Sequence, residues 1–198
     1  LVLDLGFSSD TLEYSGRGFS FERDEPLLMT YRTGDEPVFQ VLRRTDEMEL
    51  ARILGEFGEE RYARRIARAI KAALVRGPVD TSGKLADIIA KAVPRGYERG
   101  RIHPATRTFM ALRIYANHEL ENLEALLDIL PSVMKKGGRV CIVSFHSLED
   151  RPVKQRFAEY VRGGLATYLT RKPVQPSREE LSRNPRARGA KLRAIAFR

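Results

Sequence analysis

The sequence is poor in the residues that build disulfide-bonded and metal-centred folds. It has one cysteine, Cys141, three histidines and no tryptophan in 198 residues. A single cysteine excludes an internal disulfide framework and fits a reducing compartment, so we expect a cytoplasmic protein. Because His103, His118 and His146 are widely spaced and form no Cys/His cluster, we predict no metal site.

Long apolar runs are also missing. No stretch approaches the ~20 apolar residues that a membrane-spanning helix needs, and the first residues, LVLDLGFSS, lack the basic segment of a signal peptide. We therefore predict no membrane association. The chain has no initiator methionine and opens within a strand-like apolar run, so we expect an N-terminal portion to be missing.

Positive charge is in excess, with 35 Lys and Arg against 26 Asp and Glu and a net charge of +9. The excess is concentrated from Arg171 onward, where the chain has nine basic residues and only two acidic ones, Glu179 and Glu180. Such a basic tail indicates a polyanionic partner, with nucleic acid the leading candidate. A solvated, positively charged surface is the alternative.

Helical patterns dominate the first half of the chain. Residues 13–45 read as irregular because Gly and Pro interrupt them, and Thr45 is a candidate N-cap for a helix over 46–57. The segment 59–75 is two-faced, with arginines opposite an apolar stripe; its basic side is either a solvated face or a phosphate-facing ridge. Thr81 caps a third helix that stops at Pro94, and a basic, glycine-rich loop, RGYERGR, follows.

The second half alternates helices and strands. One or two helices over 103–134, the first beginning near Pro104, lead through Gly137 and Gly138 into the apolar strand RVCIVSF. A helix near SLEDRPVK, a capping box from Ser177 to Glu180 and a last strand, KLRAIAF, complete the chain. This order predicts an α/β sheet, whose ligands bind beyond the carboxyl ends of its strands. The loops after Asp4 and at His146 should therefore lie side by side.

The segment SFHSLEDR, residues 144–151, contains serine, histidine and acidic groups, but it does not resemble a hydrolase triad. A nucleophilic serine needs a strained elbow and a base from another loop, whereas His146 and Ser147 are adjacent. Ser147 stands where a helix N-cap belongs. Pro152 would instead favour a helix that begins nearer Asp150, because proline removes a helical N–H group.

The expected cleft combines a carboxylate, hydroxyls, one imidazole and aromatic rings, which can stack on a planar base and accept hydrogen bonds from its exocyclic amine. These residues are Asp4, Phe7, Ser8, Ser9, Phe19, Ser144, Phe145, His146 and Ser147.

Six segments carry a resemblance to a known family: LVLDLGFSS, RGFSF, GEERYARRIARAI, HPATRTFMALRI, GGRVCIVSFHSLEDR and NPRARGAKLR. In this order they resemble the MraW (RsmH) family, S-adenosylmethionine-dependent methyltransferases that act on the N4 amine of a cytidine in small-subunit ribosomal RNA. The resemblance implies a Rossmann-like methyltransferase domain, residues 1–12 and 119–198, interrupted by an inserted helical domain, residues 13–118. It implies ribosomal RNA or a ribosomal subunit as partner, and a homodimer is one assembly it allows.

The resemblance also assigns roles to residues. Ser8, Ser9 and His146 would lie near the target amine, and Asp4, Gly6 and Thr11 near S-adenosylmethionine, with Thr11 replacing a glutamine of the family. Substrate-binding candidates are Phe7, Phe19, Arg107, Arg113, Asn117, Ser144, Phe145, Arg186 and Arg188. For each arginine, a structural ion pair is the alternative to a phosphate contact.

The family's glycine-rich cofactor loop and the acidic residue after its second strand would lie upstream of Leu1. We therefore expect these 198 residues alone to bind S-adenosylmethionine weakly or not at all. A non-catalytic RNA-binding or ribosome-assembly relative is the alternative to an enzyme, and a fragment of a longer gene product is a third reading.

Overall fold

The computed structural model describes residues 1–8, 15–100 and 102–198. Ser9 and Thr11, two of the predicted site residues, lie outside this set. The chain forms two compact units. The sheet unit comprises residues 1–7 and 120–198, and the helical unit comprises residues 8–119.

The sheet unit has four strands in the order β1-β2-β4-β3. Its elements are β1 (Val2–Asp4), α7 (Glu119–Val133, in this unit from residue 120), β2 (Arg139–Ser144), α8 (Ser147–Arg162), β3 (Ala166–Tyr168), α9 (Arg178–Arg183), the 3-10 helix η2 (Pro185–Gly189) and β4 (Lys191–Phe197). β1 is parallel to β2, and β4 runs antiparallel to both β2 and β3. The predicted α/β class is thus observed, although no sequence pattern predicted the short strand β3.

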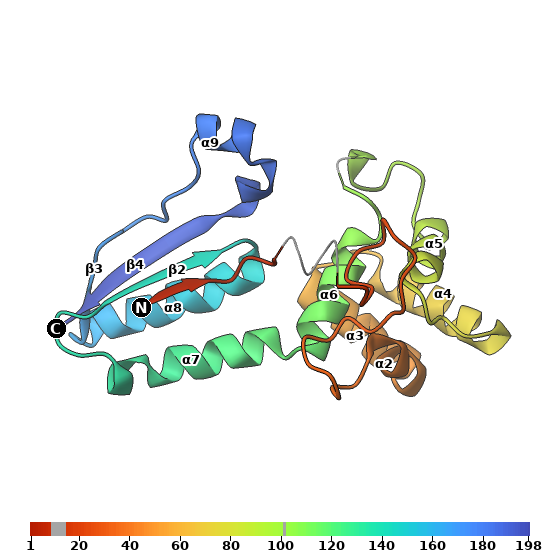
Figure 1. Cartoon of the computed structure of the whole chain (residues 1–198), viewed down its shortest axis with the longest axis horizontal. Helices are drawn as coiled ribbons and strands as arrows, with labels where there is room; N and C mark the ends of the chain where they lie inside the picture. Colours follow the sequence, from red (N-terminus) through yellow and green to blue (C-terminus); the bar gives the residue numbers. More distant parts are fainter. Residues whose placement is uncertain (9–14, 101) are drawn as a thin grey trace. The chain divides into compact units, whose positions relative to one another are not determined.

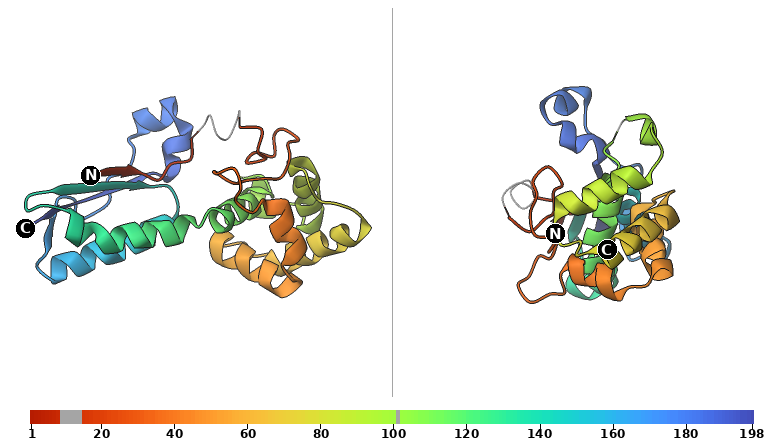
Figure 2. Two further views of the ribbon diagram at one scale, coloured as in Figure 1. Left: turned by 60° about the horizontal axis from the view of Figure 1, so that its bottom comes forward. Right: turned by 90° about the vertical axis from the view of Figure 1, so that its right-hand side faces the viewer.

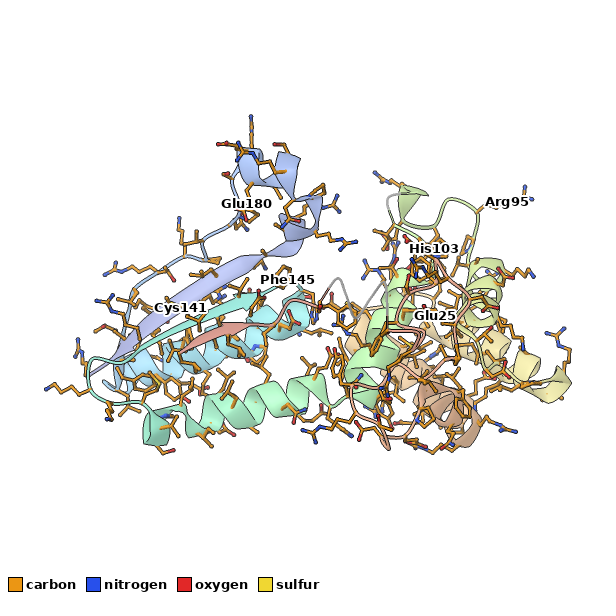
Figure 3. The ribbon with its side chains drawn as sticks, in the orientation of Figure 1. Glu25, Arg95, His103, Cys141, Phe145 and Glu180 are labelled. Carbon is orange, nitrogen blue, oxygen red and sulfur yellow. The ribbon has the colours of Figure 1, made fainter. Side chains whose placement is uncertain are left out.

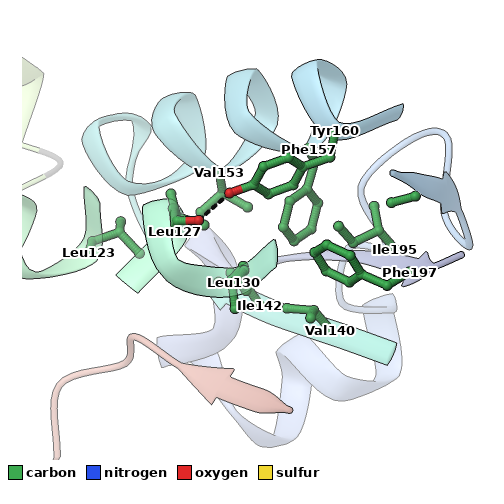
Figure 4. Close-up of a cluster of buried hydrophobic side chains, with 11 residues drawn as sticks. Leu123, Leu127, Leu130, Val140, Ile142, Val153, Phe157, Tyr160, Ile195 and Phe197 are labelled. Atoms are coloured by element: carbon green, nitrogen blue, oxygen red, sulfur yellow. Dashed lines mark hydrogen bonds between the residues drawn. The ribbon is translucent and has the colours of Figure 1, made fainter. Parts of the chain in front are cut away.

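Helices α7 and α8 cover the same face of this sheet (Figures 1 and 2). Alternate residues of β2, Val140 and Ile142, point into the core, where they meet residues of both helices and of β4 (Figure 4). Phe157 of α8 is 1% exposed, and the hydroxyl of Tyr160 donates to the carbonyl of Leu127 on α7. Burial raises the pKa of the Tyr160 phenol. This shared core fixes α8, and hence the segment that precedes it, against the sheet.

The start of α8 differs from the prediction. His146, not Ser147, occupies the N-cap position, and its carbonyl accepts the first helical hydrogen bond from the Asp150 N–H at 3.1 Å. The helix continues through Pro152, so the expectation of a start nearer Asp150 is wrong as well. One missing N–H group is tolerated because the buried side chains Val153 and Phe157 anchor the following turns in the core.

The helical unit contains five α-helices among the described residues and one 3-10 helix. They are α2 (Val38–Arg44), α3 (Glu47–Gly58), α4 (Ala63–Arg76), α5 (Ser82–Ala92), η1 (Tyr97–Gly100) and α6 (Thr106–Ala116). Helix α2 falls in a segment that the sequence predicted to be irregular. On α4 the predicted faces are confirmed, since Ile66 and Ile70 are fully buried while Arg64 and Arg65 are exposed.

Of the two threonine N-caps predicted from the sequence, one is observed and the other is not. Thr81 caps α5, its hydroxyl accepting the Lys84 N–H, as predicted. Thr45 does not cap α3: it ends α2, and the Asp46 carboxylate accepts the Glu49 N–H at 2.7 Å instead. Both residue types suit an N-cap, and the stronger acceptor adjacent to the helix takes the position.

Glycines on α3 give a matched pair for testing how this unit is packed. A Cβ at Gly58 would lie 2.7 Å from the Arg107 carbonyl oxygen and 3.1 Å from the Ala111 Cβ on α6, whereas a Cβ at Gly55 would meet nothing closer than 3.9 Å. We expect Gly58→Ala to destabilise the unit by about 1–3 kcal/mol through overpacking. Gly55→Ala should be neutral or stabilise by up to ~1 kcal/mol.

Urea unfolding followed by circular dichroism measures both variants. Equal stabilities for Gly58→Ala and Gly55→Ala would contradict the close approach of α3 and α6.

Candidate active site

The carboxyl ends of β1 and β2 lie side by side, as the sequence predicted. Asp4 stands opposite Val143 in the parallel register, and the Leu5 N–H donates to the Val143 carbonyl at 2.9 Å. The residues that follow the two strands, 5–7 and 145–146, therefore meet at one edge of the sheet. In open α/β sheets this is the edge at which ligands bind.

A close approach between Gly6 and Phe145 shapes this edge. The Asp4 carboxylate accepts the Gly6 N–H at 2.8 Å and so folds the chain tightly after β1. A Cβ at Gly6 would lie 2.8 Å from the Phe145 ring and 2.9 Å from the Asp4 carboxylate, so a larger residue would displace at least one of these side chains. Phe145 stands at the end of β2 (Figure 3). Asp4 and Gly6 are both exposed at this edge, and the cofactor-binding roles expected of them stay predictions.

Glu149 organises the segment around His146. It is 6% exposed, and one carboxylate oxygen accepts the Phe145 N–H at 2.7 Å. The other oxygen lies 3.0 Å from His146 Nε2. That contact is poorly aligned, and within the described residues neither imidazole nitrogen makes a hydrogen bond, although both are shielded from solvent. Shielded imidazole nitrogens without hydrogen bonds, next to a carboxylate, call for an explanation, and a functional role is one.

Asp150 has a structural role next to this pair. Its carboxylate accepts two hydrogen bonds from Arg193, at 2.7 and 3.1 Å, and one from Lys191 at 3.3 Å. The Arg193 hydrogen bonds, more than any other contact, hold the pKa of this carboxyl below its usual range. Because Asp150 is 8% exposed, this pairing fixes the first turn of α8 to β4.

The basic loop before β4 packs on the same edge. A Cβ at Gly189 would lie only 2.3 Å from the Phe145 carbonyl oxygen, so η2 contacts the backbone beside His146. Arg186 and Arg188 are exposed on η2. Two arginines thus stand on a segment that touches the candidate site, a suitable arrangement for phosphate contacts. Ser144 is 2% exposed and its hydroxyl donates to the Lys191 carbonyl at 3.4 Å, and its substrate-binding role stays a prediction.

Four predicted substrate-binding residues lie in the helical unit, where their side chains contact other residues of the same unit. Phe19 is 5% exposed and stacks on Tyr31, with ring centroids 5.5 Å apart. Arg113 forms a two-point ion pair with Glu119, at 2.9 and 3.0 Å. Asn117 bonds the backbone of Tyr31 and Met29.

Arg107, the fourth of these residues, donates to the Glu59 carbonyl at 3.1 Å and lies 3.4 Å from Glu98. Internal contacts thus engage Phe19, Arg113 and Asn117 in the helical unit, and their substrate-binding roles stay predictions. Ser8 is exposed, and Phe7 is half-buried.

Two features of the site were missed from the sequence, the Glu149 contacts and the Asp150–Arg193 pair. The acidic pair in the first turn of α8 carries a recognisable signal, because carboxylates favour helix N-termini. The partner across the sheet, Arg193, has no such signal. Among the described residues, no group of three His, Cys, Asp or Glu side chains gathers as a metal site, and none of the helices in that part of the chain is long and apolar enough to cross a membrane.

A parallel strand pair with a carboxylate, a glycine and an imidazole at its carboxyl edge places the chain among α/β proteins that bind a ligand at the end of their strands. A sequence model described as the MraW methylase family matches residues 1–198, and the chain belongs to that family. This membership confirms the predicted fold class, the methyltransferase class and S-adenosylmethionine as methyl donor.

Named relatives agree with the family match. Proteins called ribosomal RNA small subunit methyltransferase H are 50% identical over 98% of this chain in Anaeromyxobacter sp. (strain K), 49% over 99% in Koribacter versatilis and 48% over 98% in Nostoc punctiforme. The chain covers 67%, 62% and 63% of these three proteins. It thus spans about two thirds of the length of the relatives it matches.

Proposed function

We propose that this protein transfers a methyl group from S-adenosylmethionine to the N4 amine of a cytidine in small-subunit ribosomal RNA. The observation that carries the proposal is the shared edge of β1 and β2, where Gly6 and Phe145 meet beside His146. The relatives' names, ribosomal RNA small subunit methyltransferase H, support the substrate. The sheet unit is then part of the catalytic domain and the helical unit its insertion, working on ribosomal subunits in the cytoplasm.

The chemistry asks the protein mainly to position a weak nucleophile. The N4 lone pair of cytosine is delocalised into the ring, so the amine must be held in line with the methyl group and must be favoured in its pyramidal form. Acceptors for its N–H bonds do this, and orientation of this kind contributes several kcal/mol to catalysis. S-adenosylmethionine supplies an electrophilic methyl group on a positively charged sulfur.

Each residue of the edge has a role in the proposal. The proposal assigns His146, Ser8 and Ser9 to the target amine, and Phe7 or Phe145 to stacking on the base. Asp4 and Gly6 would hold the cofactor, with Thr11 following them along the chain. Arg186 and Arg188 hold phosphates near the site; the proximity of η2 to Phe145 supports this. Glu149 orients the backbone of Phe145 and faces the imidazole.

The proposal is tested by methyl transfer in vitro with the protein as it is produced in the cell. Labelled S-adenosylmethionine is offered with naked small-subunit rRNA or with assembled subunits, and the modified nucleoside is identified by mass spectrometry. We expect N4-methylcytidine at one position in at least one of the two substrates. A methyl group on another atom, such as cytosine C5, or binding of RNA without any transfer, would contradict it; the second result would indicate a non-catalytic assembly protein.

A further inference from the structure

The helical unit carries an open pocket of about 400 Å³ that the proposed methyl-transfer site does not use. It lies between the beginning of α4 and the loop after α5. Its lining combines arginines and tyrosines with a glycine: Arg61, Tyr62, Pro94, Arg95, Gly96, Tyr97, Glu98 and Arg99. Residues 95–99 of this lining belong to the segment RGYERGR, predicted from the sequence to be a basic, glycine-rich loop.

The loop is held in an uncommon backbone conformation. Gly96 and Gly100 have φ of 80° and 71°, and the non-glycine residues Glu98 and Arg99 have φ of 46° and 54°. Left-handed conformations cost non-glycine residues about 1–2 kcal/mol each. Such strain persists only where surrounding contacts determine it, and it is enriched at ligand-binding sites.

A buried carboxylate supplies those contacts. Glu60 is 4% exposed; one of its oxygens accepts the Tyr62 N–H at 2.8 Å and the other accepts the Tyr97 hydroxyl at 2.5 Å. Burial, together with the bond to Glu60, raises the pKa of Tyr97 above its ordinary value. Glu60 thereby ties the loop to the start of α4, so the pocket is built before any ligand binds.

The pocket has a strong excess of positive charge. Its one acidic residue, Glu98, lies 2.9 Å from Arg61 and 3.4 Å from Arg107 and is shared between them. Arg95 and Arg99 are exposed, and neither has an ion-pair partner in the part of the chain that the structure describes. Arg95 projects outward from the loop (Figure 3). The ring of Tyr62 is half-buried, and the guanidinium carbon of Arg61 lies over it, 6.0 Å from the ring centroid.

We propose that this pocket binds a nucleotide of single-stranded RNA, with its phosphate on Arg95 and Arg99 and its base against the Tyr62 side of the pocket. Guanidinium groups match phosphate oxygens in geometry and charge. A concave pocket with an aromatic wall accepts an unstacked base, whereas a duplex keeps its bases stacked inside. The inference rests on the proposed function only in taking RNA as the substrate. It adds an RNA contact in the helical unit to the one proposed at the sheet edge.

The test measures binding of the 198-residue chain to a fluorescent single-stranded oligoribonucleotide by anisotropy, across a salt series. We expect Arg95→Ala with Arg99→Ala to weaken binding about tenfold and to reduce the slope of log affinity against log salt by about 1.4, the value for two phosphate contacts on a single strand. Tyr62→Leu should weaken binding about fivefold or more and leave the salt slope unchanged.

The matched control removes the same charge elsewhere in this unit. Arg43→Ala with Arg76→Ala changes two exposed arginines, at the ends of α2 and α4, outside the pocket; we expect an effect within about twofold. Equal losses in the two double variants, no loss in either, or preferential binding of a duplex of the same sequence would overturn the inference. Thermal melting by circular dichroism verifies that all variants are folded.

This outcome is separable from that of the proposed function. If methyl transfer to cytidine proceeds while the pocket variants bind RNA normally, only the pocket inference fails. If the pocket variants lose RNA binding but the protein transfers no methyl group, the proposed function fails and the pocket stands.

Discussion

His146→Ala is expected to lower kcat for methyl transfer about a hundredfold or more. The imidazole nitrogens are shielded and without hydrogen bonds in the described part of the chain, and Nε2 lies 3.0 Å from Glu149. We expect this imidazole to accept an N–H bond of the target amine, and a positioned proton acceptor contributes on the order of 10²–10⁴ in rate. Steady-state kinetics with RNA and S-adenosylmethionine measures kcat and KM separately.

The control for this variant is His118→Asn, which changes an exposed histidine of the helical unit. His118 has φ of 52°, a conformation that asparagine tolerates, and its replacement should leave kcat unchanged. The kcat of Glu149→Gln should lie between those of the two histidine variants. The glutamine oxygen still accepts the Phe145 N–H, but the side chain no longer presents a negative charge to His146. A His146→Ala rate within threefold of the parent would remove His146 from the reaction.

Asp150→Asn is expected to destabilise the sheet unit by about 2–4 kcal/mol. The substitution leaves Arg193, whose side chain is 13% exposed, without its charged partner, and removing one member of a buried pair is more costly than the pair's net contribution. Asp128→Asn is the matched control, because Asp128 pairs with Arg156 at the surface and exposed pairs contribute about 0–1 kcal/mol. Urea unfolding at neutral pH compares the two.

The same carboxylate predicts an acid-sensitive contribution to stability. The pKa of Asp150 is lowered in the folded state, so its contribution is fully present above the unfolded value of about 3.9 and is lost as pH falls through the folded value. Below about pH 4 the parent protein and Asp150→Asn should therefore converge in stability. A difference that stays constant from pH 7 to pH 3 would show that the variant acts through packing alone.

Local signals in the sequence predicted most of the sheet unit. The apolar runs that became β2 and β4, the glycines before β2 and the Ser177 cap each act over a few residues, so their outcomes do not depend on the rest of the fold. Parallel pairing of the first strand with β2 followed from their hydrophobicity and from the helix between them. These elements position Asp4, Gly6, Phe145 and His146.

Contacts between residues distant in the chain could not be predicted from the sequence in this way. The Arg113–Glu119 ion pair uses a guanidinium that sequence pattern alone cannot distinguish from a phosphate ligand. Phe19, which the sequence suggested as a substrate-binding residue, is buried and stacks on the exposed ring of Tyr31. The start of α8 depended on the core contacts of Val153 and Phe157, which outweigh the local effect of Pro152. In each case tertiary packing overrides a local preference.

The central claim, that the edge at His146 methylates N4 of a cytidine in small-subunit ribosomal RNA, is tested most directly in the organism that carries the gene. Ribosomal RNA is isolated from cells with the gene intact, deleted, and restored as parent or as His146→Ala, and N4-methylcytidine is quantified by nucleoside mass spectrometry. The account predicts that deletion abolishes the modification, that the parent gene restores it and that His146→Ala does not. Modification that persists after deletion, or full restoration by His146→Ala, would contradict it.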